Sequence, residues 1–108
     1  MDEYEFQNRA EAALSDLEAA LGRLTDTYDL DPEFHAGALT IEFGDPPARF
    51  VVSPNGPVRQ IWVSAHSTSF KLDWDPELGH FVFRPGGQTL RELVAELVSR
   101  QLGEEVTL

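Results

Sequence analysis

The 108-residue chain contains no cysteine, which excludes disulfides, thiol catalysis and thiolate metal ligation by its own residues. Its three histidines, His35, His66 and His80, are far apart and lack the spacing of metal ligands. No apolar run approaches the ~20 residues that a membrane span needs. There is also no phosphate-binding glycine loop and no nucleophile elbow. These absences disfavour nucleotide enzymes and hydrolases, and they leave carboxylates as the main metal-binding groups.

Basic residues are scarce as well. Eight Lys and Arg face 19 Asp and Glu, and the formal net charge is -11. Residues 1–45 hold twelve of the acids and two arginines, a net charge of -10, whereas residues 46–108 are nearly balanced. Such a field repels nucleic acid and anionic membranes, and it attracts cations and basic protein surfaces. We expect no nucleic-acid or membrane partner. Because the acidic N-terminus is unlike a signal peptide, we expect a cytoplasmic protein.

The order of expected elements is helix, strands, helix. Apolar residues at three- and four-residue spacing predict a helix over residues 3–24 and another over residues 90–102, which starts at the capping box of Thr89 and Glu92. Period-two alternation predicts strands near residues 39–43, 50–53, 59–65, 70–74 and 81–84, and a weaker one near residues 30–35. The sequence thus predicts an α+β fold in a single domain of residues 1–108. It is a two-layer α/β sandwich with the N- and C-terminal helices packed on one face of a five- to six-stranded antiparallel sheet.

One strand carries a tryptophan on its polar side. In the segment RQIWVSA, from Arg59 to Ala65, Trp62 alternates with the apolar positions and shares a face with Gln60 and Ser64. That face is the one the predicted helices leave in solvent. An exposed indole there is a candidate contact residue, because Trp is enriched among interface hot spots. The alternative is that a neighbouring side chain or loop covers it.

The acidic residues form two rows, which we call the acidic ridge. The ridge consists of Glu3, Glu11 and Glu18 on the first helix, followed by Asp26, Asp29, Asp31 and Glu33. Carboxylates without cysteine or clustered histidine favour hard cations such as Mg²⁺, Ca²⁺, Mn²⁺ and the ions of iron. The loose spacing predicts weak, labile binding at several sites. The alternative is a solvated acidic face that confers solubility.

Several segments together resemble the frataxin family, in its bacterial CyaY form. The most specific are PVRQIWVS at residues 57–64 and FKLDW at residues 70–74, supported by GALTI at residues 37–41 and GQTL at residues 87–90. The resemblance spans nearly the whole chain. It implies the same α-β-α order, weak binding of ferrous and ferric iron, and a role in iron–sulfur cluster assembly through contact with a cysteine desulfurase and a scaffold protein.

The resemblance also assigns roles to particular residues. The acidic ridge matches the family's iron-binding positions, with Asp26 nearby rather than matched. Gln60 and Trp62 match exposed sheet residues used toward the assembly complex, and Asn55 and Arg59 complete the expected partner-binding set. The segment from Gly22 to Thr25 has no acid where many bacterial members cluster them. This thinner ridge argues against high-capacity iron loading.

Three functional hypotheses follow. The first is an iron-binding regulator of iron–sulfur assembly, a monomer whose iron is weakly held and exposed to competition from other hard divalent cations. The second is an acidic protein–protein interaction module whose metal binding is incidental. The third, a ferroxidase, is not favoured because no clustered histidines are present to build a redox site; we therefore do not expect an enzyme.

Overall fold

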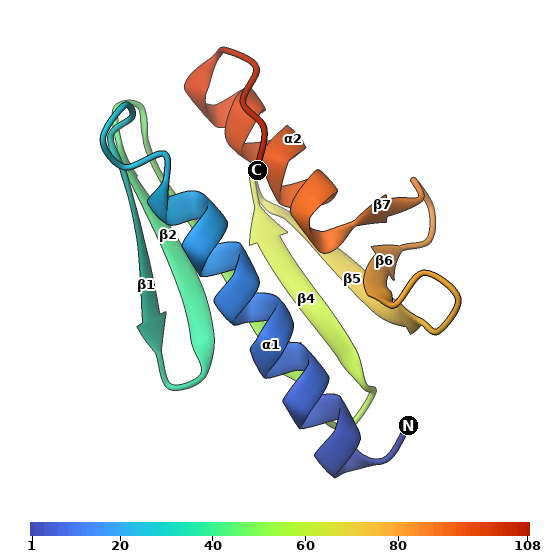
Figure 1. Cartoon of the computed structure of the whole chain (residues 1–108). Coiled ribbons are helices and arrows are strands. Elements are labelled where there is room, and N and C mark those ends of the chain that lie inside the picture. Colours follow the sequence, from blue (N-terminus) through green and yellow to red (C-terminus); the bar gives the residue numbers. More distant parts are fainter.

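The computed structural model describes residues 1–108 as two helices on one face of an antiparallel sheet (Figure 1). The elements are α1 (Glu3–Gly22), β1 (Leu30–His35), β2 (Ala38–Gly44), β3 (Pro47–Asn55), β4 (Gln60–Ala65), β5 (Thr68–Asp75), β6 (His80–Phe83), β7 (Gln88–Thr89) and α2 (Leu90–Leu102). The predicted α+β sandwich is confirmed. Neither helix combines the length and the apolar composition that crossing a bilayer requires.

The helices begin where the sequence predicts. The Asp2 side chain accepts a hydrogen bond of 2.7 Å from the Glu5 backbone N–H and caps α1. The capping box at Thr89 and Glu92 starts α2, and Gly103 ends it in the left-handed conformation that glycine adopts without strain. The first helix is two residues shorter than predicted. It ends at Gly22, and turns follow up to β1.

The strands form a meander in which each strand pairs with the next, in the order β1 to β7. All pairs are antiparallel, because the connections between consecutive strands are short. The sheet has seven strands rather than five or six. The weak first strand is present, and β7 pairs with the end of β6 through Val82–Thr89 and Phe83–Gln88. A two-residue strand is too short to show alternation, so sequence periodicity missed it.

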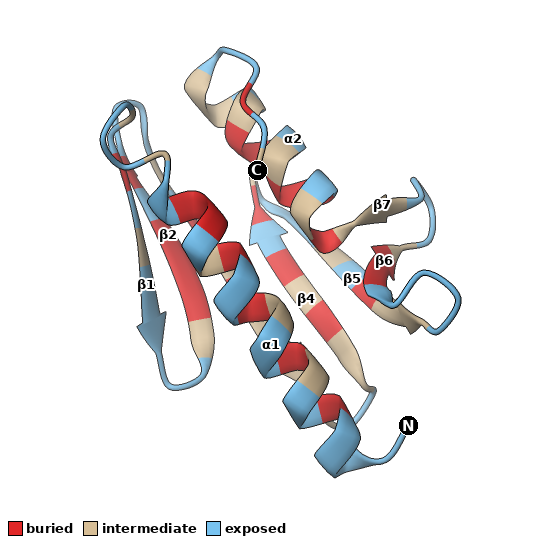
Figure 2. Ribbon diagram, in the orientation of Figure 1, coloured by how far each residue is buried: buried red, intermediate tan, exposed pale blue.

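The core lies between the helices and the sheet. Figure 2 shows buried positions alternating with partly exposed ones along β4, where Ile61, Val63 and Ala65 face the helices. Phe6 of α1 meets Phe81 of β6 edge to face, with ring centroids 5.9 Å apart. After α2, the chain returns to the helix layer, where Val106 is buried and its N–H donates to the Ser99 hydroxyl at 2.9 Å. This packing leaves the opposite sheet face uncovered by any helix.

Candidate functional site

The α1 row of the ridge lies along the outside of the first helix. Glu3 and Glu11 are exposed and Glu18 is half-buried. The helical spacing of eight and then seven residues places them near one line, because two turns advance by about seven residues. None of the three has an ion-pair partner. Their negative charge is therefore not neutralised within the protein.

The β1 row follows the edge strand of the sheet. Asp31 and Glu33 are exposed and lie opposite Glu42 and Thr40 of β2, on the sheet face that carries no helix. Glu33 has one weak partner, the His35 ring at 3.6 Å. Glu42, opposite Asp31, is a further carboxylate on this face, but it forms an ion pair with Arg49, whose Nε lies 3.3 Å from the Glu42 Oε1. The β1 row thus retains most of its negative charge.

Asp29 precedes β1 and lies against the end of β2. Its backbone carbonyl accepts the Gly44 N–H at 3.2 Å, and its carboxylate covers the Gly44 Cα so closely that a Cβ there would come within 1.9 Å of the Asp29 Oδ2. Glycine at position 44 therefore makes room for this carboxylate. Asp26 is exposed in the turns between α1 and β1.

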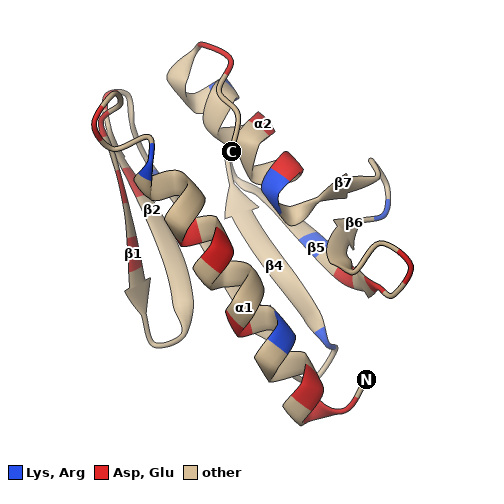
Figure 3. Ribbon diagram, viewed as in Figure 1, with Lys and Arg blue, Asp and Glu red and all other residues tan.

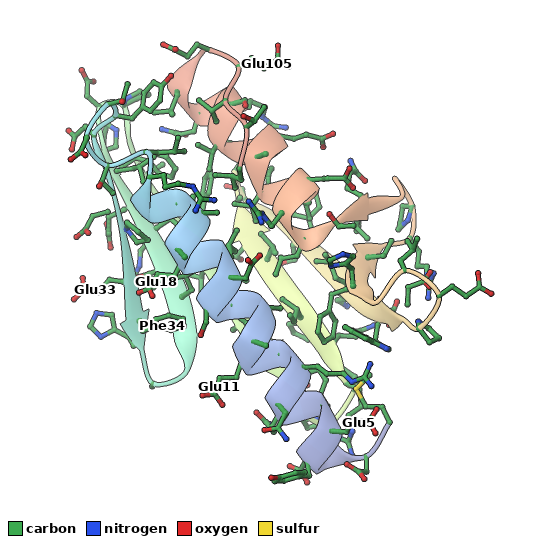
Figure 4. All side chains as sticks on the ribbon, viewed as in Figure 1. Glu5, Glu11, Glu18, Glu33, Phe34 and Glu105 are labelled. Carbon is green, nitrogen blue, oxygen red and sulfur yellow. The ribbon has the colours of Figure 1, made fainter.

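The two rows border one edge of the molecule. Figure 3 shows acidic residues recurring along α1 and β1. Figure 4 shows Glu11 and Glu18 on the side of α1 toward β1, and Glu33 at the outer side of β1. The α1 row belongs to the helix layer, however, whereas Asp31 and Glu33 are on the open sheet face. No group of three or more His, Asp or Glu side chains comes together to hold a metal ion. The ridge is thus a band of separate carboxylates.

This arrangement limits what the ridge can do with a cation. Oxygen ligands suit Mg²⁺, Ca²⁺, Mn²⁺ and the ions of iron, but a tightly held ion needs several ligands already close together. Single or paired carboxylates that keep their water give weak attachment and rapid exchange. The same unneutralised charge attracts a basic protein surface over a range of about one Debye length.

Trp62 lies on the open face of β4, between Ser53 of β3 and Lys71 of β5. Its indole Nε1 donates to the Gln60 Oε1 at 2.9 Å, and the Gln60 Nε2 donates to the Asp73 Oδ1 at 3.0 Å. The Lys71 ammonium stands over the indole, 5.0 Å from the ring centroid. Trp62 is therefore half-buried rather than fully exposed. Neighbouring side chains cover part of the ring and fix its orientation.

A shallow hollow of about 270 Å³ adjoins the exposed part of the indole. Val51, Ser53, Ser64 and Ser69 line it with Trp62, so small hydroxyl side chains surround the aromatic ring. A flat aromatic surface with small neighbours can accept a partner side chain without any rearrangement of the sheet. We call the part of this hollow that these five residues form the Trp62 patch.

The other two predicted partner-binding residues flank the β3–β4 turn. Asn55 ends β3 opposite Gln60 and is half-buried. Arg59 has a positive φ of 55°, and its guanidinium donates to the Gly56 carbonyl of the same turn. The Arg59 side chain is therefore engaged in shaping the turn.

Two titratable groups have shifted pKa values, and neither belongs to the ridge. The pKa of the Tyr28 hydroxyl is raised because it donates to the Glu104 carboxylate at 2.7 Å. The pKa of Asp75 is lowered because its carboxylate accepts the Leu78 N–H and also the Arg84 guanidinium at 2.9 Å. Both contacts hold connecting segments: the first ties the α1–β1 turns to the C-terminal tail, and the second closes the β5–β6 turn.

Sequence reasoning did not single out Lys71 and Asp73. The available signal was the register: two strands joined across the turn at His66 and Ser67 place Lys71 opposite Trp62 and Asp73 opposite Gln60. Alternation gives the face of each residue, but it does not give the partner in the next strand.

Comparison with known proteins agrees with the fold. The protein-family model of the frataxin-like domain matches residues 1–104 of this sequence. A protein of Janthinobacterium sp. (strain Marseille), named iron-sulfur cluster assembly protein CyaY, is 36% identical over 110 residues, which cover 100% of this chain and 96% of the relative. A protein of the same name from Tolumonas auensis is 32% identical over 108 residues, which cover 100% of this chain and 99% of the relative.

Solved structures share the architecture. A frataxin from Psychromonas ingrahamii superposes with a TM-score of 0.82 at 18% identity, covering 99% of this chain and 97% of the other. Yeast frataxin gives a TM-score of 0.72 at 22% identity, covering 93% and 82%. At these identities the structures support the fold alone, whereas the family model and the full-length relatives support descent. The chain belongs to the frataxin family.

Proposed function

We propose that this protein acts in iron–sulfur cluster assembly as an iron-binding regulator. Its relatives from Janthinobacterium and Tolumonas are named iron-sulfur cluster assembly proteins. The proposed partners are a cysteine desulfurase, which would meet the acidic ridge, and a scaffold protein, which would meet the Trp62 patch. The proposed location is the cytoplasm, and the proposed state is a monomer without enzymatic activity of its own.

One observation carries the proposal: nearly all the excess charge of the protein lies in residues 1–45, which contain the acidic ridge. Residues 1–45 account for -10 of the net charge of -11, and the carboxylates at Glu3, Glu11 and Glu18 have no ion-pair partner. Like charges this close together disfavour the compact state unless a cation or a basic surface compensates them. A protein retaining such a band gains stability whenever either one binds.

The donor set supports iron as transient cargo. The ridge offers oxygen ligands, which suit hard cations, but its carboxylates do not gather into a group of three. Ferrous or ferric iron would bind weakly, lower the local negative charge and so weaken attraction to a basic surface. Iron level and desulfurase docking would then be linked through one set of side chains. Other hard divalent cations are expected to compete for the same oxygens.

An anaerobic titration of the ¹⁵N-labelled protein with ferrous iron tests the metal-linked part. At near-physiological salt and with excess magnesium, we expect selective loss of amide signals near Glu11, Glu18, Asp31 and Glu33. The Glu18→Gln variant should lose part of this response on α1. Glu105→Gln changes the charge equally at an exposed acid outside the ridge, and it should respond like the unmodified protein. Uniform or absent changes would rule out an iron site on the ridge.

Charge reversal tests the docking part. The double variant Glu18→Lys, Asp31→Lys should bind the desulfurase about tenfold more weakly at low salt, because steering by complementary charge is lost. The difference should shrink as salt is added. The control, Glu77→Lys with Glu105→Lys, reverses two exposed acids outside the ridge and gives the same net charge. Equal binding by both double variants would show that the acidic ridge does not contribute to desulfurase binding.

A second candidate function is an interaction module whose metal binding is incidental. The absence of any gathered group of three carboxylates favours it. It predicts that charge reversal weakens desulfurase binding while iron, in the presence of magnesium, changes neither the amide signals nor the affinity. The two experiments together therefore separate the candidates.

A further inference from the structure

A pocket is lined by residues of α1, the start of α2 and the β5–β6 region. Figure 1 shows α2, β5 and β6 on the side of α1 away from β1. The volume of the pocket is about 280 Å³. The titratable side chains that line it are Arg9 and Asp16 of α1, His80 of β6 and Arg91 of α2, and the Thr89 hydroxyl is also part of the lining. None of these residues belongs to the acidic ridge or to the Trp62 patch, so the inference below does not depend on the proposed function above.

The charge in this pocket is opposite to that of the molecule. Two of the chain's eight Lys and Arg, Arg9 and Arg91, line the pocket against a single carboxylate, that of Asp16. A protein with a net charge of -11 repels small anions in general. A cationic pocket on such a surface is therefore a local exception that needs a physical explanation.

Arg9 is held in position by an aromatic ring. Its guanidinium carbon lies 4.3 Å from the Trp74 ring centroid, which is cation–π geometry. Its ionic contact, to Glu5 at 3.1 Å, joins two partly exposed side chains four residues apart on one helix, and such pairs contribute only about 0.3–0.5 kcal/mol. The planar guanidinium is thus oriented before any ligand arrives and keeps N–H donors available.

Arg91 has few contacts for its N–H donors within the protein. Its single ionic contact is a long one, 3.4 Å from Nη1 to the Asp16 Oδ2, and its enclosed Nε has no hydrogen-bond partner. Asp16 itself is 57% exposed, so water screens the pair. A guanidinium has five N–H donors in a fork that matches a carboxylate. Most of these donors have no acceptor in the protein.

The backbone N–H groups at the start of α2 add to the positive potential in the pocket. The capping box satisfies the N–H groups of Thr89 and Glu92, through the Glu92 carboxylate at 2.9 Å and the Thr89 hydroxyl at 3.4 Å. Leu90 and Arg91 are the first two helical residues, and their N–H groups have no acceptor within the helix. Both residues line the pocket. The positive end of the helix dipole therefore reinforces the two guanidinium groups.

The remaining walls are apolar. Ala12, Ala13, Trp74, Phe81 and Leu90 line the pocket beside the charged groups. A pocket of this size with apolar walls and convergent cationic donors suits a small organic ligand with one charged end. Inorganic anions would leave the apolar walls without a partner. We propose that this pocket binds a small organic carboxylate, with the carboxylate at Arg9 and Arg91 and the apolar body against Trp74 and Leu90.

Sodium benzoate is the probe, and the two indole N–H signals in the ¹H–¹⁵N spectrum of the full chain are the measurement. Trp74 lies in the pocket and Trp62 lies on the open sheet face, so one residue type reports both surfaces. Benzoate should shift the Trp74 indole signal in a saturable way and leave that of Trp62 in place. A Trp62→Phe variant assigns the two signals. Benzamide, which lacks the charge, should shift neither.

Variants at the polar wall give the decisive comparison. Arg91→Gln should weaken benzoate binding about tenfold, since a charge-assisted hydrogen bond is lost. Arg100→Gln removes the same charge from the exposed end of α2 and should leave the affinity unchanged. Asp16→Asn should tighten binding, because the competing carboxylate is gone. A purely structural role for Arg91 does not produce this opposite effect.

The outcomes that overturn the proposal are definite. They are no saturable shift of the Trp74 signal, equal shifts of both indoles, or equal binding by Arg91→Gln and Arg100→Gln. If inorganic phosphate shifts the Trp74 signal and benzoate does not, the pocket is a general oxyanion site and the organic ligand is wrong. Thermal melts of each variant show whether it is folded before its affinity is compared.

Discussion

Replacing Trp62 with alanine separates a contact role for its indole from a structural one. The indole is half-buried on the open sheet face, and its polar edge and one ring face are engaged within the protein. The substitution removes the hydrogen bond to Gln60 and the contact with the Lys71 ammonium. It opens no cavity between the sheet and the helices, because Trp62 points away from them.

The expected cost to stability follows from these contacts. The neutral hydrogen bond to Gln60 contributes about 1 kcal/mol. The cation–π contact with Lys71 adds about 0.5–1 kcal/mol. Partial apolar burial of the ring adds roughly 1 kcal/mol, less than a fully buried side chain would. The free energy of unfolding should fall by about 2.5–3 kcal/mol, which is less than the 5–15 kcal/mol typical of a domain.

Two measurements check this prediction. Urea unfolding gives the loss of stability, and a binding titration with the scaffold protein, at a temperature where both proteins are folded, gives the loss of affinity. If Trp62 is an interface hot spot, Trp62→Ala should cost at least about 2 kcal/mol of binding, or about 30-fold. The control is Ile61→Ala, a fully buried neighbour on the covered face that should cost about 2–5 kcal/mol of stability and no affinity while folded.

A double-mutant cycle with Lys71 sharpens the test. Lys71→Met keeps the aliphatic stem and removes the ammonium, and its coupling to Trp62→Ala should be about 0.5–1 kcal/mol in the unfolding free energy. The reasoning is refuted if Trp62→Ala unfolds the domain, since the indole would then be part of the core. It is refuted equally if the folded variant binds the scaffold protein as tightly as the unmodified chain.

Two further predictions concern stability. The pKa of Asp75 is lowered in the folded state, so its contribution to the free energy of unfolding is present above the ordinary carboxylate pKa and is lost as pH falls through the lowered value. Asp75→Asn should therefore lower the melting temperature at pH 7 and make that temperature vary less between pH 5 and pH 2. An unchanged fall in melting temperature between pH 5 and pH 2 would contradict this. Thr89→Ala removes the cap of α2 and should lower the free energy of unfolding in urea by about 1 kcal/mol. The control, Thr107→Ala at an exposed position, should leave that free energy almost unchanged. Equal losses of stability would show that the cap does not stabilise the helix.

Local signals in the sequence predicted most of the fold. The apolar stripe of α1 and the alternation in β2, β4 and β5 were enough to assign helix or strand, because burial of one face imposes a period of 3.6 or of 2. The capping residues Asp2 and Thr89 marked the helix starts, since they satisfy N–H groups a few residues away. The C-terminal boundary of α1 and the short strand β7 lacked such local signals.

The candidate site was predictable in its composition and less so in its geometry. The acidic ridge follows directly from the concentration of carboxylates in the first 45 residues. Whether those carboxylates meet depends on the face of β1 that carries Asp31 and Glu33, and on its position relative to α1. The register with β2 directs these two to the open face, away from the layer of Glu11 and Glu18. This separation explains why no gathered cation site results.

The sequence by itself determined most of the elements, the α+β class and the sign of the surface charge, because these depend on residue type and on spacing within a few turns. The tertiary structure alone decided that Lys71 covers Trp62 and that Arg9 and Arg91 share a pocket with Trp74. Such contacts join residues far apart in the chain. They depend on strand register, sheet twist and helix placement, which are set by packing of the whole core and leave no periodic trace in the residues that finally meet.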